Sequence, residues 1–227
     1  MKIHGLQKMT LLDYPTKTAC TVFAGGCNLR CPFCHNADLV RRPMAVESME
    51  GEVLAYLEKR RGLLDGVCVT GGEPLLQPDL IVFLEKLKAM GYLVKLDTNG
   101  RLPERLRTAL KTGLVDYVAM DLKHTPEGYC RAVGCEVEPE HFLRSMEILQ
   151  ESGVFYELRT TAVKGIHKIE DFGEMARLIP QEPPYFIQCF KDSGNLLSGG
   201  CAAFSEAELR VCLAEAKKYH QNTYLRG

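Results

Sequence analysis

The sequence lacks a long apolar run and has almost no net charge. Of its 227 residues, 46% are hydrophobic and 25% are charged, and the formal net charge is −1. No apolar stretch approaches the length that crosses a membrane, and the opening residues Met1–Gly5 carry no apolar signal core. The balance of acidic and basic residues gives no support to a nucleic-acid-binding surface. We therefore expect a cytoplasmic protein with neither a membrane nor a nucleic acid as partner.

The chain also lacks a low-complexity linker and a clear domain boundary. Its length is that of one domain with a substantial core, so we expect a single domain over residues 1–227. Ten cysteines without an export signal are expected to be reduced thiols. A second metal cluster built from Cys130, Cys135 and Cys201 is an open alternative. The cysteines scattered outside one close group are Cys20, Cys68, Cys130, Cys135, Cys189, Cys201 and Cys212.

Short apolar runs alternate with helical patterns along the chain, which predicts strands and helices in turn. Six strand–helix units indicate an α/β fold with a parallel sheet, right-handed crossovers and outer helices. Because a full barrel needs eight units, we expect a partial (β/α)6 barrel. The predicted strands are Thr18–Ala24, Gly66–Thr70, Tyr92–Leu96, Tyr117–Leu122, Val154–Val163 and Tyr185–Phe190. The predicted helices are Val46–Lys59, Asp79–Met90, Pro103–Lys111, Pro139–Glu151, Ile169–Ile179 and Ser205–Tyr219, the last with a capping box at its start.

Three cysteines stand together directly after the first predicted strand. Cys27, Cys31 and Cys34 have the spacing C-x3-C-x2-C and are followed by His35. Three thiolates on one loop can hold three corners of an iron–sulfur cube and leave the fourth iron open for chemistry. With His35 as a fourth ligand the loop is instead a zinc site, and Cys31 with Cys34 alone is a dithiol redox pair. No second cysteine pair of zinc-site spacing follows, and a redox pair leaves Cys27 unexplained, so we favour the cluster.

Polar motifs follow the other predicted strands. The working residues of parallel α/β folds lie beyond the carboxyl ends of the strands, so we expect these motifs to meet on one rim. Each motif alone is more often an ordinary turn, and their shared location strengthens the functional interpretation. The motifs are Gly71-Gly72-Glu73, Asp97-Thr98-Asn99-Gly100, Asp121-Leu122-Lys123, Arg159 within the fifth strand, and Phe190-Lys191 at the end of the sixth.

Together these motifs resemble the radical S-adenosylmethionine superfamily, and within it the activating enzymes of glycyl-radical proteins. The resemblance runs from Leu12-Asp13-Tyr14-Pro15 to Phe190. Its opening K-M-T-L-L-D-Y-P and its lack of an inserted ferredoxin-like domain are most similar to activators of the anaerobic ribonucleoside-triphosphate reductase. The resemblance implies a [4Fe–4S] cluster held by the three loop cysteines alone, with S-adenosylmethionine on the open iron. An electron from the cluster then cleaves this cofactor to a 5′-deoxyadenosyl radical, and no side chain acts as a further catalytic group.

The resemblance also implies which residues surround S-adenosylmethionine. Gly71 and Gly72 let the backbone approach the methionine ammonium, while Glu73 accepts a hydrogen bond there or braces the loop. Phe33 matches an aromatic residue whose backbone meets the adenine, and Phe190 is our choice for a ring stacked on the base. The remaining cofactor-binding residues implied are Thr98, Asp121, Lys123, Arg159 and Thr161.

A monovalent cation is a further implied ligand, held by Asp97, Thr98 and Asp121 beside the cofactor's carboxylate. The plain alternative for Asp121 and Lys123 is a strand-end ion pair. The chain departs from the family at Thr16, where a glycine is common, which leaves the first turn uncertain. It also lacks the histidine that the pyruvate formate-lyase activator carries near adenine at the end of the sixth strand.

The expected function is the generation of a glycyl radical on a partner enzyme. The first expected partner is the anaerobic ribonucleotide reductase, with flavodoxin or ferredoxin as electron donor. Alternatives of the same class are an activator of pyruvate formate-lyase or of another glycyl-radical enzyme, and a radical enzyme with a small-molecule substrate. The alternative of a different class is a zinc- or cluster-binding protein without turnover.

Overall fold

A computed structural model describes residues 1–41, 48–192 and 194–227. Nine strands within these residues form one sheet in the order β1-β2-β3-β4-β5-β6-β7-β9, with β8 paired to β6. All neighbours from β2 to β9 along this order are parallel, whereas β1 and β8 are antiparallel to their partners. The strands are β1 (Ile3–Thr10), β2 (Ala19–Ala24), β3 (Gly66–Gly71), β4 (Leu93–Thr98), β5 (Tyr117–Asp121), β6 (Phe155–Lys164), β7 (Tyr185–Cys189), β8 (Ala202–Ala203) and β9 (Thr223–Arg226).

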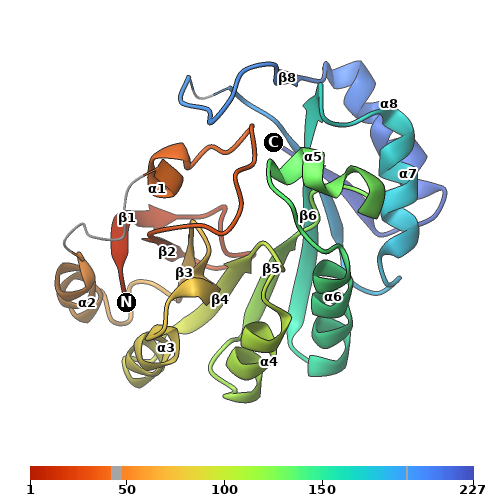
Figure 1. The fold of residues 1–227 in the computed structure, drawn as a ribbon. Helices are drawn as coiled ribbons and strands as arrows, with labels where there is room; N and C mark the ends of the chain where they lie inside the picture. The colour runs from red at the N-terminus through yellow and green to blue at the C-terminus, as the bar shows by residue number, and fades with distance from the viewer. Residues whose placement is uncertain (42–47, 193) are drawn as a thin grey trace.

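Helices cover the outer face of the curved sheet (Figure 1). Figure 1 shows α3, α4 and α6 side by side along this face, and α7 packs against α8 at the far end. This arrangement confirms the predicted partial barrel with outer helices. Within the described residues, no helix is long and apolar enough to span a membrane. The helices are α1 (Ala37–Arg41), α2 (Glu50–Glu58), α3 (Leu80–Ala89), α4 (Pro103–Lys111), α5 (Tyr129–Val133), α6 (Glu140–Ser152), α7 (Ile169–Leu178) and α8 (Glu206–Lys217).

Successive side chains of β6 point to opposite faces of the sheet, one toward the outer helices and the next toward the interior cavity. Thr160 faces the helices, because its hydroxyl donates to the Leu122 carbonyl at 2.6 Å and lies 3.9 Å from the sulfur of Met175 on α7. Arg159 and Thr161, on the opposite face, line the interior cavity. Side chains two residues apart share a face of a strand, so Arg159 and Thr161 both point into the barrel interior.

The six predicted strands are all present, and their ends differ from the prediction by one or two residues, which is the usual uncertainty of such boundaries. The structure adds β1 and β9, which the sequence did not reveal. In β1 polar and apolar residues mix and the pairing with β2 is irregular, and β9 has only four residues. The predicted parallel sheet is confirmed from β2 to β9, and β1 and the two-residue β8 are additions that run antiparallel to their partners.

Five of the predicted helices have counterparts that begin within one residue of their expected starts. Ser205 and Glu208 form the expected capping box at the start of α8. The helix expected from Val46 begins only at Glu50 among the described residues, and its predicted first two residues, 46 and 47, lie outside them. The short helices α1 and α5 were not predicted.

Thr16 lies in the turn between β1 and β2 with φ of 62°. This is the left-handed region, in which a β-carbon costs about 1 kcal/mol or more and glycine costs little. Thr16 thus takes the conformation that glycine, common at this position in the family it resembles, adopts most easily.

Candidate active site

A cavity of about 410 Å³ lies where the carboxyl ends of the strands meet. It brings together most of the residues expected from the sequence: Cys27, Cys31, Phe33, Cys34, Gly71, Gly72, Asp97, Thr98, Asp121, Lys123, Arg159 and Thr161. Sequence reasoning missed nine other lining residues, most of which adjoin a recognised motif. These are Asp13, Leu29, His35, Asn36, Val40, Thr70, Asn99, Gln188 and Cys189.

The cysteine loop between β2 and α1 is held in place by neighbouring segments of the chain. The Arg30 amide donates to the Val133 carbonyl at the end of α5 at 2.8 Å. The side-chain amide of Asn99, from the loop after β4, donates to Oδ1 of Asn28 at 2.8 Å. Asn36 donates from Nδ2 to the Gly71 carbonyl at 3.1 Å. Two strand ends and the end of α5 therefore fix the position of the three thiols.

The three thiols of the loop are largely shielded from water and have one cation, Lys123, near them. Burial raises the pKa of Cys27 to about 11 and that of Cys31 to about 12, and it raises the pKa of Cys34 as well. Lys123 opposes this shift at all three cysteines. The amide nitrogen of Asn99 lies 3.7 Å from the Cys27 sulfur as a hydrogen-bond donor. Bound iron would supply the positive charge that keeps these sulfurs as thiolates, so the donor set fits an iron–sulfur cluster.

A single zinc ion fits these residues less well. Sulfurs bound to one tetrahedral zinc at about 2.3 Å lie close together. Within the described ranges, no group of three or more His, Cys, Asp or Glu side chains is gathered to hold one metal ion. The His35 ring instead contacts Phe190 edge-on, with 5.6 Å between ring centroids. The structure thus places the His35 ring against Phe190.

The two glycines after β3 are required first by packing within the chain. Gly71 has φ of 119°, and a β-carbon there would lie 2.3 Å from the backbone nitrogen of Ala24. At Gly72 a β-carbon would lie 1.9 Å from the carbonyl oxygen of Gly26. Both distances are far below van der Waals contact. The glycines thus let the end of β3 lie directly against the start of the cysteine loop.

Glu73 braces the loops, which is the second of its two expected roles, and it is not among the described residues that line the cavity. Its side chain is fully buried. The carboxylate accepts hydrogen bonds from the amide of Leu75 at 3.0 Å, the hydroxyl of Thr98 at 2.9 Å and the amide of Asn99 at 2.8 Å. Burial raises the pKa of Glu73 to about 7 despite these bonds. Its two oxygens join the ends of β3 and β4.

Phe190, our choice for a ring stacked on adenine, stays a prediction, and the structure gives only its packing. Its ring is buried and packs against His35. Among the described residues that line the cavity, the end of β7 contributes Gln188 and Cys189 instead. An aromatic ring gains more from burial at this position than from exposure in a polar cavity.

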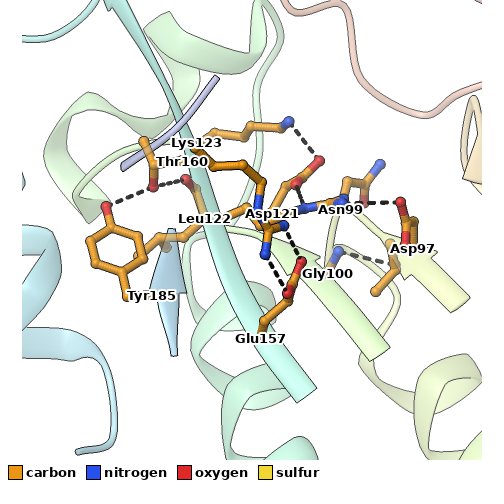
Figure 2. A network of polar contacts seen from close by, with 12 residues as sticks. Asp97, Asn99, Gly100, Asp121, Leu122, Lys123, Glu157, Thr160 and Tyr185 are labelled. Carbon is orange, nitrogen blue, oxygen red and sulfur yellow. Dashed lines mark hydrogen bonds and ion pairs between the residues drawn. The ribbon is translucent and has the colours of Figure 1, made fainter. Parts of the chain in front are cut away.

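An alternating row of charged side chains crosses the floor of the cavity (Figure 2). Arg159 donates from Nε to Oδ1 of Asp121 at 2.9 Å and from Nη1 to Oδ2 of Asp97 at 3.1 Å. Lys123 donates to Oδ2 of Asp121 at 2.9 Å, and Lys95 donates to Oδ1 of Asp97. The order is Lys95, Asp97, Arg159, Asp121 and Lys123.

Both carboxylates of this row are held in the charged form. Burial alone raises the pKa of Asp121, but Arg159 and Lys123 outweigh it and lower that pKa to about 2. The pKa of Asp97 is lowered too, because Arg159 and Lys95 together outweigh its burial. Every oxygen of the two carboxylates therefore already accepts a hydrogen bond from a cationic nitrogen. Arg159 lies between the two aspartates, at the place expected for the monovalent cation.

The sequence pattern that defines the Radical SAM superfamily matches residues 21–179, which include the cysteine loop and most of the cavity. The chain belongs to this superfamily. It is a radical SAM enzyme, and its family uses a [4Fe–4S] cluster and S-adenosylmethionine.

Relatives of this radical SAM enzyme include a Methanocaldococcus jannaschii protein provisionally described as a glycyl-radical enzyme activating enzyme. The two are 32% identical over 234 residues, which cover 99% of this chain and 95% of the relative. The pyruvate formate-lyase-activating enzyme of Clostridium pasteurianum is 35% identical over 134 residues, covering 56% of this chain and 55% of that protein. A solved structure of a radical SAM methyltransferase from Sphaerobacter thermophilus has the same fold. Its TM-score is 0.75 at 15% identity, covering 96% of this chain and 68% of that chain.

In this radical SAM enzyme, Cys27, Cys31 and Cys34 would hold the cluster, and the charged floor would receive the methionine part of the cofactor. When bound, the two groups supply a one-electron cleavage of the sulfonium and hydrogen abstraction by the resulting carbon radical. Lys123 and Arg159 line the cavity and would present positive charge toward the carboxylate of the cofactor.

Proposed function

We propose that this enzyme generates a glycyl radical on a partner protein, and that the partner is an anaerobic ribonucleoside-triphosphate reductase. The observation that carries the first part is the similarity to the M. jannaschii protein over almost the whole of both chains. The second part rests on the opening segment Lys8–Pro15, which resembles that of the reductase activators. The electron donor in this proposal is a flavodoxin or a ferredoxin.

Exposed apolar side chains next to the cavity support a protein substrate. Leu11 and Leu12 are 67% and 86% exposed, and the next residue, Asp13, lines the cavity. The turn is ordered, because the hydroxyl oxygen of Thr10 accepts hydrogen bonds from the amides of Leu12 and Asp13 at 3.2 Å each. In this proposal the partner's loop that carries the radical-site glycine covers the two leucines. A glycine Cα suits the reaction, because its radical is stabilised by both flanking amides.

The test is anaerobic mixing of the reduced, iron-reconstituted enzyme with S-adenosylmethionine and the reductase, followed by electron spin resonance. We expect a doublet from one α-hydrogen on the reductase, together with 5′-deoxyadenosine and methionine as products. The doublet should vanish when the radical-site glycine of the reductase is replaced by alanine. It should also vanish with Cys31→Ala, which lacks a cluster ligand.

Other outcomes identify the alternatives. A radical on pyruvate formate-lyase but not on the reductase would keep the reaction and change the partner. Formation of 5′-deoxyadenosine without a radical on any glycyl-radical enzyme would indicate a small-molecule substrate. A Leu11→Ser, Leu12→Ser double variant should still cleave the cofactor but require about tenfold more partner for the same radical yield.

A further inference from the structure

We propose that the side chains of Lys95 and Arg159 replace a free monovalent cation between Asp97 and Asp121, so that this enzyme binds S-adenosylmethionine without potassium or sodium. The proposal concerns cofactor binding and rests on membership of the superfamily. It does not depend on which partner receives the radical.

The first argument is the occupancy of the carboxylate oxygens. A cation that joins the two aspartates needs room between them, in contact with at least one oxygen of each. Arg159 reaches one oxygen of Asp97 and one of Asp121, at 3.1 and 2.9 Å. Lys95 pairs with the second oxygen of Asp97, and Lys123 pairs with the second oxygen of Asp121. The guanidinium thus occupies the bridging position between the strands that a free cation would need.

The second argument is the burial of Lys95, which no sequence motif pointed to. Its side chain is 1% exposed, and it lies two residues before Asp97 on the same face of β4. Besides Asp97, its ammonium has the Cys68 sulfur at 3.8 Å as a hydrogen-bond acceptor. A free cation that displaced this ammonium from Asp97 would leave a buried charge without a carboxylate partner. That exchange is strongly unfavourable in an interior of low polarity.

The third argument is the balance of charge. Lys95, Lys123 and Arg159 carry one more positive charge than the two aspartates neutralise. Lys123 and Arg159 also line the cavity. This excess has the sign required to bind the carboxylate of the methionine group, which is the task that a bound cation would otherwise perform.

The test measures cofactor binding to the reconstituted holoenzyme by anaerobic calorimetry. The salts are potassium, sodium and tetramethylammonium chloride at one ionic strength. We expect the dissociation constant of the wild-type enzyme to agree within about twofold among the three salts. Thallium NMR, with Tl⁺ as a potassium surrogate, should show no ion bound to the wild-type enzyme in either the presence or the absence of the cofactor.

Lys95→Met should make cofactor binding depend on potassium, which the wild-type enzyme does not need. One oxygen of Asp97 loses its cation, so binding in tetramethylammonium should weaken about tenfold and potassium should restore it. Lys88→Met is the matched control, because Lys88 also pairs with an aspartate, Asp116, in a partly buried position, and neither residue lines the cavity. It should behave as the wild-type enzyme in all three salts.

Two results would overturn the proposal. One is wild-type binding that is about tenfold tighter in potassium than in tetramethylammonium, or a Tl⁺ signal from a bound ion in the wild-type enzyme. The other is a folded, cluster-bearing Lys95→Met protein that binds the cofactor with wild-type affinity in every salt. The wild-type measurements decide the question even if Lys95→Met fails to hold its cluster.

Discussion

At the scale of residues, two glycines show that backbone packing fixes the position of the cysteine loop. The Gly71-Gly72 pair is recognisable in the sequence, and its expected purpose was a close approach of the backbone to the cofactor. In the structure the same glycines already touch the chain itself, at the backbone of Ala24 and Gly26. The motif therefore serves the position of the cysteine loop at least as directly as it serves the ligand.

Gly72→Ala should prevent assembly of the cluster. The added methyl group would meet the Gly26 carbonyl at 1.9 Å, so the cysteine loop has to move away from β3. We expect iron and sulfide content after anaerobic reconstitution to fall to the level of Cys31→Ala. Gly51→Ala in α2 is the control, because a β-carbon there meets nothing within 4 Å. The control should keep its cluster and gain about 0.5–1 kcal/mol in unfolding free energy, and a full cluster in Gly72→Ala would contradict this account.

At the scale of elements, the turn from β6 into α7 supports the backbone of Lys123, which lines the cavity. His167 in this turn accepts a hydrogen bond at Nδ1 from the Val163 amide at 3.1 Å. Its Nε2 donates to the carbonyl of Lys123 at 2.8 Å. The ring also stacks on His124, with 5.0 Å between centroids. A hydrogen bond from the neutral, buried imidazole of His167 thus holds the backbone of Lys123 in place.

This histidine should make the fold sensitive to mild acid. Burial lowers the pKa of His167 to about 4, whereas the unfolded chain titrates near about 6.5. Between these values the unfolded chain binds more protons, so the unfolding free energy falls as the pH falls through this window. We expect a loss of about 2 kcal/mol from His167 between about pH 7 and about pH 5, measured by denaturant unfolding.

His167→Gln should flatten this dependence, since the amide can accept and donate the same two hydrogen bonds without titrating. His141→Gln is the control, because the side chain of His141 is 43% exposed. It should leave the pH dependence unchanged. An equal loss of stability in wild-type and His167→Gln proteins would assign the acid sensitivity to other groups.

At the scale of the whole molecule, a buried ion pair ties the last strand to the sheet. Glu157 on β6 is 1% exposed at its side chain and accepts two bonds from Arg226 on β9, at 2.7 and 2.9 Å. Tyr117 donates to the same carboxylate at 3.1 Å. The guanidinium of Arg226 also lies 3.5 Å from the centroid of the Phe186 ring. This pair joins strands that are two places apart in the sheet.

Arg226→Met should destabilise the protein by about 3 kcal/mol or more, because the buried Glu157 carboxylate loses its cation. Adding Glu157→Gln should recover most of that loss, since the remaining group is then neutral. Urea unfolding of the two single variants and the double variant measures the coupling. Equal stability of Arg226→Met and the double variant would mean that the ion pair does not hold β9.

The sequence by itself determined the features that local patterns encode. Alternating apolar runs located the six inner strands, and the spacing of Cys27, Cys31 and Cys34 identified the loop that would carry the cluster. Positions two apart on a strand also showed that Arg159 and Thr161 share a face. These inferences need only the periodicity of the backbone and the chemistry of each residue type.

Only the tertiary structure decided which side chains meet across strands. Glu73 turns inward to join two loops, Phe190 packs on His35, and Arg159 lies between two aspartates from β4 and β5. The edge strands β1 and β9 likewise exist through pairing with distant residues. Periodicity assigns a side chain to a face of the sheet, but its partner depends on register, burial and charge in segments far along the chain.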